Sequence, residues 1–378
     1  MRILERDART GADDAFVQLP HALYAGDPCW IPDEEHVLRA SFSAANDWFA
    51  RGCALALCVP GRARLAVFRA PDCRVDGRPA AFFGYFEAGD DAVAAGALLE
   101  RASEWARAAG AEVLYGPVDF DTLGRYRLRT AVEPGGGLPF PGEPYGRPCY
   151  PAMLEDAGFS VVRRYTSQLS RGAERPDEGK WRAAQALLAT GYTIESLTAA
   201  TWMRLLPDLH RHVDAAFTDA FAYLPASFGR FAALQGAGVA RRLCPHTSVL
   251  AYAADGELAG FMLVFPHYGP LAVQGAGRAR VAASALCFEE HAATLARCGP
   301  RVGIVKSVGI APAHRQRGVM DALAVAVLER GQGHYDRWMA ALIREKNHSA
   351  RYGGRRQRLE RSYALYAKPV RAGGGVEP

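Results

Sequence analysis

The chain has 378 residues, of which 49% are hydrophobic and 22% are charged, close to the average for globular proteins. This length predicts two domains or three small ones, and the composition excludes a wholly disordered protein. The formal net charge of +5 is too small to indicate a partner by itself, so the positions of the arginines must decide whether they bind phosphates.

Cysteine usage and hydropathy predict a cytoplasmic protein. The 8 cysteines include no CxxC pair, and no His/Cys grouping has the spacing of a zinc site. No apolar run reaches about 18 residues, so we expect no membrane span. The N-terminus also lacks the apolar region of a signal peptide. We predict no metal, because His210 and His212 lie two positions apart on an expected helix and face apart.

The first part of the chain predicts alternating strands and helices. One helix is expected to begin at Asp90 and Asp91 and to end before Gly110, because Asp favours N-caps and Gly favours helix ends. Residues 130–149 are rich in Pro and Gly and are expected to form a loop. The expected strands cover residues 1–9, 53–59, 64–70, 80–87, 112–115 and 159–170, and the expected helices cover 13–25, 90–109 and 151–157.

The second part repeats this order of elements. Residues 171–180 are polar, contain Gly and Pro, and form the best linker candidate. The expected strands cover residues 192–197, 247–253, 258–265, 302–310, 338–343 and 359–368, and the expected helices cover 202–217, 280–297 and 316–330. We therefore predict an α/β fold with a mixed sheet, used twice and divided into residues 1–175 and 176–378.

The segment after the strand at residues 302–310 is the most informative. The strand ends at Ala311-Pro312, and an apolar helix follows Gly318. A strand that leads into a glycine turn at a helix start presents unpaired backbone N–H groups and the positive end of the helix dipole. The pattern predicts a phosphate or pyrophosphate site, although an ordinary turn with surface arginines fits it equally well.

The segment from Ile310 to Leu323 resembles the acyl-CoA loop of the GNAT superfamily of acyltransferases. Asn347, followed by Ala350, matches the downstream Asn-x-x-Ala of that family, whereas Met320 stands where the family has Gly or Ala. Four further stretches resemble a group of two-part GNAT-like proteins in which only the C-terminal half keeps the phosphate loop; they cover residues 16–32, 82–91, 115–121 and 150–159. The resemblance implies two tandem GNAT-like domains, with residues 176–378 as the catalytic one.

The resemblance also implies which residues bind acyl-CoA. Backbone groups of Val308 and Ile310 would bond the pantetheine arm. The remaining cofactor contacts would come from the loop, the first residues of the helix and the downstream asparagine, namely Arg315, Gln316, Arg317, Gly318, Val319, Met320 and Asn347. In the first half, Asp90 and Asp91 occupy the equivalent turn, where they would repel a pyrophosphate.

Acyl transfer to an amine needs an acid for the leaving thiolate and a base for the attacking amine. The candidate acids are Tyr363, Tyr366 and Tyr352, although each also fits a buried structural tyrosine. His267 is the preferred base, although a loop histidine without a catalytic role fits the pattern as well. The other candidate bases are Glu87, Asp119, Asp121, His246 and Glu289.

An arginine-rich stretch lies close to the C-terminus and comprises Arg351, Arg355, Arg356, Arg358 and Arg361. It fits a solvated connection between two elements, contacts to the nucleotide phosphates of CoA, or docking of a large anionic donor such as an acyl carrier protein or an aminoacyl-tRNA.

These patterns and the resemblance together favour an N-acyltransferase that moves an acyl group from a CoA thioester to a small-molecule amine. One alternative is transfer that depends on aminoacyl-tRNA or on an acyl carrier protein. An alternative of another class is a non-catalytic binding module that keeps the fold.

Overall fold

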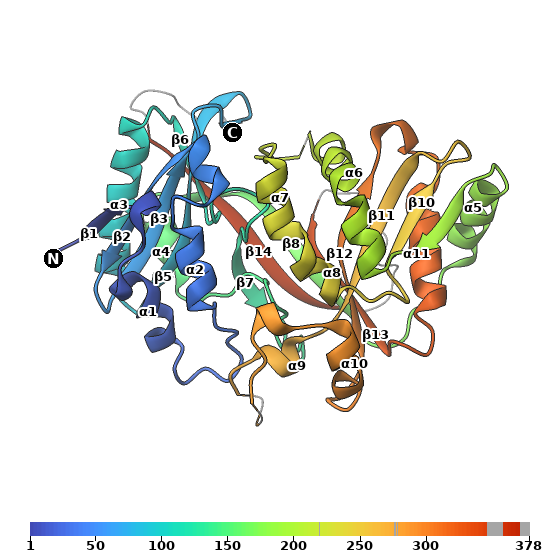
Figure 1. Ribbon diagram of the computed structural model, residues 1–378. Helices are drawn as coiled ribbons and strands as arrows, with labels where there is room; N and C mark the ends of the chain where they lie inside the picture. The colour runs from blue at the N-terminus through green and yellow to red at the C-terminus, as the bar shows by residue number, and fades with distance from the viewer. Residues whose placement is uncertain (219, 276, 278, 346–357, 371–378) are drawn as a thin grey trace.

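The computed structural model describes residues 1–218, 220–275, 277, 279–345 and 358–370. It contains one mixed sheet in which the strand order is β1-β2-β3-β5-β6-β14-β8-β13-β12-β11-β10-β9, with β4 and β7 paired off this path. The sheet runs through two parts that lie side by side (Figure 1). We call residues 1–175 the N-terminal half and residues 176–378 the C-terminal half.

The strands of the N-terminal half are β1 (Leu4–Asp7), β2 (Cys53–Val59), β3 (Ala63–Arg69), β4 (Arg74–Val75), β5 (Arg78–Ala88), β6 (Val113–Gly116), β7 (Leu128–Val132) and β8 (Ser160–Ser170). Its helices are α1 (Asp14–Leu23), α2 (Glu35–Ser41), α3 (Ala92–Ala108) and α4 (Tyr150–Asp156).

The strands of the C-terminal half are β9 (Thr193–Ser196), β10 (Val249–Tyr252), β11 (Leu258–Pro266), β12 (Val302–Ile310), β13 (Arg337–Arg344) and β14 (Arg358–Pro369). Its helices are α5 (Glu178–Leu188), α6 (Ala199–Phe217), α7 (Phe228–Gln235), α8 (Ala237–Arg242), α9 (Gly269–Ala272), α10 (Phe288–Leu295) and α11 (Val319–Arg330).

The predicted fold class, an α/β protein with a mixed sheet, is confirmed. The expected strand at residues 302–310 has the observed bounds of β12. The single helix expected at 280–297 is wrong: a short 3-10 turn at Ala283–Ala285 is followed by α10. The helix expected from residue 316 begins at Val319, because residues 315–318 form the turn that precedes it.

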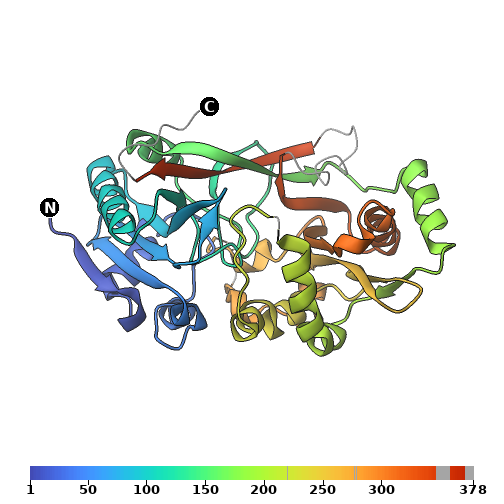
Figure 2. The same ribbon diagram turned by 90° about the horizontal axis from the view of Figure 1, so that it is seen from above.

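The last strands of the two halves are exchanged. β8 pairs with β13 of the C-terminal half, β14 pairs with β6 of the N-terminal half, and the two strands pair antiparallel with each other. Figure 2 shows β8 and β14 together across the top of both halves. The sheet is therefore continuous across the predicted boundary at residue 175, and the predicted linker at 171–180 connects β8 to α5.

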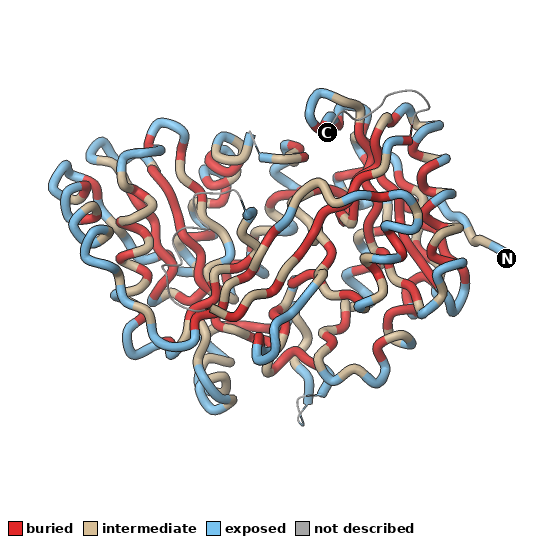
Figure 3. The backbone as a smooth tube through the Cα atoms, turned by 180° about the vertical axis from the view of Figure 1, so that it is seen from behind, coloured by how far each residue is buried: buried red, intermediate tan, exposed pale blue. Residues whose placement is uncertain are grey.

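Each half buries both faces of its part of the sheet. In the N-terminal half, α3 and α4 cover one face and α1 and α2 the other, and each face has its own apolar cluster. In the C-terminal half, α5 and α11 cover one face, and α6, α7 and α8 cover the other. Figure 3 shows the resulting buried strands at the centre of each half. Among the residues that the structure describes, no helix is long and apolar enough to cross a membrane.

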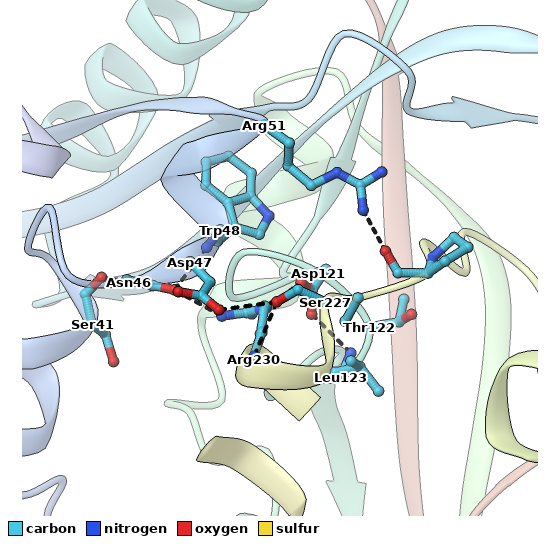
Figure 4. Close-up of polar contacts among 12 residues, drawn as sticks. Ser41, Asn46, Asp47, Trp48, Arg51, Asp121, Thr122, Leu123, Ser227 and Arg230 are labelled. Atoms are coloured by element: carbon cyan, nitrogen blue, oxygen red, sulfur yellow. Dashed lines mark hydrogen bonds and ion pairs between the residues drawn. The ribbon is translucent and has the colours of Figure 1, made fainter. Parts of the chain in front are cut away.

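A buried ion pair fastens α7 to the N-terminal half. Arg230 Nε donates to Asp121 Oδ2 at 2.8 Å, and the two side chains are only 8% and 5% exposed. Arg230 Nη1 also donates to Asn46 Oδ1 at 3.2 Å, and Ser227 Oγ donates to Asp47 Oδ2 at 3.0 Å (Figure 4). These contacts join the start of α7 to the segment after β6 and to the residues before β2.

Candidate active site

We call the turn between β12 and α11, at residues 315–318, the cradle. Gln316 has a φ of 61° and Gly318 a φ of 90°, so two residues of this turn have a positive φ. Gly318 is the N-cap and provides no side-chain cap. Within the described ranges, the backbone N–H groups of residues 316–321 have no hydrogen-bond partner. Such N–H groups, together with the helix dipole, favour a phosphate or pyrophosphate.

Two contacts hold this turn in place. Arg315 Nη2 donates to the carbonyl oxygen of Ala216, at the end of α6, over 2.7 Å. The buried His314 ring lies with Nδ1 2.7 Å from the hydroxyl of Tyr192. Ala216 lies on α6 and Tyr192 lies directly before β9, so the cradle is attached to two separate parts of the C-terminal half.

The strand that leads to the cradle has an open edge. The ladder between β12 and β13 ends at the pair Val305↔Ala340. The Ala311 N–H donates to the Ala259 carbonyl at 3.0 Å. Because hydrogen-bonded and non-bonded pairs alternate in an antiparallel ladder, the backbone groups of Val308 and Ile310 point away from β11 and toward β13. We call this gap between β12 and β13 the splay.

The N-terminal half also has a helix start and a point where two parallel strands stop pairing, but other groups of the chain occupy both. Asp91 accepts a hydrogen bond from the Ala94 N–H at 2.9 Å, so a carboxylate caps α3. The ladder between β5 and β6 ends at Phe82↔Tyr115. Beyond this point, the Val118 N–H donates to the carbonyl of Phe83 at 2.7 Å. The Tyr85 N–H donates to Asp119 Oδ1, also at 2.7 Å.

Met320 departs from the family pattern in the phosphate loop. In the structure, Met320 is the second residue of α11 and is partly buried against the apolar cluster between α11 and α5. The two residues of the turn with positive φ, Gly318 and Gln316, lie two and four positions earlier.

The strand exchange separates Tyr366 from the phosphate loop. Its residue pairs on β14 are Gly116 of β6 and Val161 of β8. The side chain is 1% exposed and packs in the apolar cluster beneath α3. Burial raises the pKa of its phenol. The structure therefore places Tyr366 in the core of the N-terminal half rather than beside the turn before α11.

Tyr363 lies at the junction of the two halves. Its hydroxyl donates to Glu143 Oε1 at 2.7 Å, and Glu143 Oε2 is paired with Arg361. All three side chains are buried. Burial and the charge of Glu143 raise the pKa of Tyr363. These bonds hold the loop around Glu143 on β14, which is a structural role.

His267 does not have the geometry of a base. Its Nδ1 accepts a hydrogen bond from the Gly269 N–H at 3.1 Å, so Nε2 carries the proton and donates to the Leu138 carbonyl at 2.9 Å. Burial and the nearby Arg361 lower its pKa. In this arrangement no ring nitrogen is left to accept a proton, and the ring joins the end of β11 to the loop at residues 133–145.

Glu87 lies inside the N-terminal half. Its Oε2 accepts hydrogen bonds from the hydroxyls of Tyr24 and Tyr150, each at 2.8 Å. Burial raises the pKa of this carboxyl. The other predicted bases are also dispersed: Asp119 and Asp121 have the backbone and ion-pair contacts given above, His246 stacks on His334 at 4.6 Å, and Glu289 is exposed on α10.

The predicted residues Asn347, Arg351, Tyr352, Arg355 and Arg356 lie outside the described residues. Arg358 and Arg361 are not available for docking of an anionic partner, because Arg358 pairs with Glu174 and Arg361 pairs with Glu143, with exposures of 9% and 2%. From the sequence we expected both arginines at the surface, whereas on β14 their side chains are almost completely buried.

The structure adds one polar residue to the splay that the sequence interpretation missed. Lys306 lies on β12, directly after the last residue paired with β13. The sequence could have indicated this residue, because it is a single lysine within the apolar stretch VGIVKSVGI. The basic residues of the chain are otherwise almost all arginine.

Among the described residues, no three His, Cys, Asp or Glu side chains are grouped so that they could hold a metal ion. A pocket of about 520 Å³ lies between the two halves, but no residue of the phosphate loop lines it; its lining is His21, Asp33, Glu34, Glu35, His36, Arg39, Arg280 and Ala282.

Comparison with known proteins agrees with this architecture. No protein-family model and no curated protein matches the sequence. Among solved structures, the chain is similar to a tandem GNAT protein from the clavulanic acid biosynthesis pathway, with 15% identity, a TM-score of 0.50, and coverage of 99% of this chain and 100% of that one. It is also similar to a GCN5-related N-acetyltransferase from Anabaena variabilis, with 9% identity, a TM-score of 0.50, and coverage of 98% and 73%. At such identities the likeness shows the fold: the chain has the tandem GNAT fold that its sequence resemblance implied.

Proposed function

We propose that the protein is an N-acyltransferase that uses a CoA thioester as donor and a small-molecule amine as acceptor. The observation that carries this proposal is the contrast between the halves. The open cradle before α11 leads directly to the open edge at Val308 and Ile310, whereas Asp91 and Asp119 close both features in the N-terminal half.

The residues present fit this donor. The N–H groups of residues 316–321 suit a pyrophosphate, and the outward backbone groups of Val308 and Ile310 suit an amide-bearing arm lying along β12 as a strand would. When bound, CoA supplies an acyl group as a thioester. The reaction forms the C–N bond of the amide and breaks the C–S bond. The attacking ammonium nitrogen loses two protons, of which one is gained by the leaving thiolate and one passes to solvent.

Binding of acetyl-CoA, measured by isothermal titration calorimetry, tests the donor site. Gly318→Asp places at the start of α11 the carboxylate that Asp91 places at the start of α3, and we expect it to abolish binding. Gly318→Ala is the matched control: it adds the cost of a side chain in the left-handed region, about 1–2 kcal/mol, without the charge. Unchanged binding by Gly318→Asp, or no binding of any acyl-CoA by the native chain, would sink CoA as the donor.

Release of free thiol in the presence of a panel of amines tests catalysis. Binding of acetyl-CoA without thiol release across the panel would favour the non-catalytic binding module. Absence of CoA binding, together with co-purified RNA and an activity destroyed by ribonuclease, would replace CoA by aminoacyl-tRNA as the donor.

A further inference from the structure

Lys306 lies on β12, at the point where β12 stops pairing with β13. On β11, Val264 is the partner of Val305 and Leu263 is the partner of Ser307, so Lys306 is the extra residue of a β-bulge. On the other side, the ladder with β13 ends at Val305. Lys306 therefore has no residue partner on either neighbouring strand, although β12 lies in the interior of the sheet.

The amine of Lys306 has no hydrogen bond or ion pair with any described residue. The two other lysines in the described ranges both do: Lys368 pairs with Glu100 at 2.8 Å and Lys180 with Asp177 at 3.5 Å. The Lys306 side chain is exposed to solvent. Surrounding protein nevertheless desolvates the amine enough to lower its pKa. The amine therefore has both solvent and protein around it.

The charged groups around this amine leave a surplus of positive charge. Desolvation, with repulsion from Arg242 and Arg127, lowers the pKa of Lys306 to about 8. Glu143 is the acidic neighbour that acts in the opposite direction. Its carboxylate is already bonded to Arg361 and to the hydroxyl of Tyr363, so it does not neutralise the lysine.

A loop of the N-terminal half passes over the amine. A Cβ atom added to Gly142 would lie 3.4 Å from Lys306 Nζ. The loop is held by Arg361 Nη2, which donates to the carbonyls of Gly136 at 2.6 Å and Leu138 at 2.7 Å. His267 Nε2 also donates to the Leu138 carbonyl. These hydrogen bonds hold the loop beside the Lys306 amine.

We propose that Lys306 binds an anionic group, a carboxylate or a phosphate, carried by the acceptor amine. This inference rests on the proposed function and names its acceptor class: amines that also bear an anion, such as amino acids or phosphorylated amino alcohols. An ammonium group without a counter-ion, close to two guanidinium groups and partly desolvated, is unfavourable until an anion binds. Its place on β12, upstream of Val308 and Ile310, puts it where the acyl end of a donor aligned on that edge would meet the acceptor.

The first test needs neither donor nor acceptor. The sulfonated N-hydroxysuccinimide ester of acetate modifies neutral lysine amines, and mass spectrometry measures the rate at each lysine. At fixed pH and ionic strength, acetate or phosphate should slow modification of Lys306 by about a factor of ten, because a bound opposite charge favours the protonated amine. Acetamide should have no effect, and Lys180 and Lys368 serve as internal controls. Equal rates at Lys306 with and without these anions would overturn the proposal.

The second test uses paired acceptors and the variant Lys306→Met. Glycine is compared with glycinamide, and O-phosphorylethanolamine with ethanolamine, which tells a carboxylate from a phosphate. The native protein should prefer the anionic member of at least one pair. Lys306→Met should raise KM for that member about tenfold relative to KM for its neutral partner, while Lys306→Arg should restore part of the preference. If the native chain does not bind acetyl-CoA, the proposed function is wrong. If it binds acetyl-CoA but shows no preference in either pair, only the proposed role of Lys306 is wrong.

Discussion

Asp91 Oδ1 accepts a hydrogen bond from the backbone N–H of Ala94 at 2.9 Å, so a carboxylate caps the start of α3 in the N-terminal half. In the C-terminal half, the corresponding helix begins at Gly318, which offers no side chain to its own N–H groups. The same fold thus provides one helix start that is already occupied by a carboxylate and one that is open to an anion.

Removing the aspartate should not create a second donor site. Asp91→Ala is expected to cost about 1 kcal/mol of stability, because an N-cap is lost. The N-terminal half should still bind no acetyl-CoA, since Val118 and Asp119 bond to β5 beyond the end of its ladder with β6. Urea denaturation and calorimetric titration check the two parts. A second bound acetyl-CoA in this variant would show that the cap alone closes the site.

The ion pair between Asp121 and Arg230 should be the costliest polar contact to break between the halves. Asp121→Asn leaves a buried guanidinium without its charge partner, and a loss of about 3–5 kcal/mol in the free energy of unfolding is expected. The double variant Asp121→Leu with Arg230→Met should lose less, because it leaves no buried charge.

Urea denaturation of these variants provides the measurement. The matched control is the exposed pair Asp208 and Arg211, whose side chains are 53% and 76% exposed. Asp208→Asn should change stability by no more than about 1 kcal/mol. Equal effects at the buried and the exposed pair would contradict the assignment of the buried pair as an interface contact.

The two tyrosines of β14 should respond differently to loss of their hydroxyls. Tyr363→Phe removes a donor from buried Glu143 and should cost about 1–3 kcal/mol. The Tyr366 hydroxyl has no hydrogen bond within the described chain, so Tyr366→Phe should cost less than about 1 kcal/mol and leave acyl transfer unchanged. A large fall in kcat with intact acetyl-CoA binding in Tyr366→Phe would restore the role as an acid that the sequence interpretation gave it.

The lowered pKa of Lys306 predicts a pH dependence of stability. Between about pH 8 and the ordinary lysine value of 10.5, the unfolded chain holds a proton at this residue that the folded chain does not hold. More protons on the unfolded state mean that stability rises with pH in this window. Desolvation is the largest cause of this lowered pKa; repulsion from Arg242 and Arg127 adds to it, and Glu143 opposes it.

Lys306→Met removes this effect. Relative to the native chain, the variant should be more stable below pH 8, and its advantage should shrink as the pH rises toward 10.5. Urea denaturation across this range, with Lys368→Met as control, measures the difference. A stability difference between Lys306→Met and the native chain that is independent of pH would show that the native fold does not lower the pKa of Lys306.

Local signals in the sequence predicted what is local in the structure. The β-branched run at 302–310, the Ala-Pro that follows it and Gly318 predicted β12, the turn and α11, because these elements are specified by neighbouring residues. The aspartates before α3 predicted a closed helix start in the same way.

Non-local pairing could not be predicted in this way. Nothing in the sequence of β14 indicates that its second part pairs with β6, and this pairing moves Tyr366 into the other half. The roles of His267 and Arg361 depend on carbonyls of the loop at residues 133–145, more than a hundred positions away. Lys306 was missed because a bulge opposite β11 and the end of the β13 ladder, rather than its sequence neighbours, make its position special.

The stoichiometry of acetyl-CoA binding tests the central claim most directly. Two copies of one fold with a single open cradle predict one acetyl-CoA per chain by calorimetric titration, and none for Gly318→Asp. Two acetyl-CoA molecules per chain, or one molecule that still binds to Gly318→Asp, would contradict the assignment of the donor site to the turn before α11.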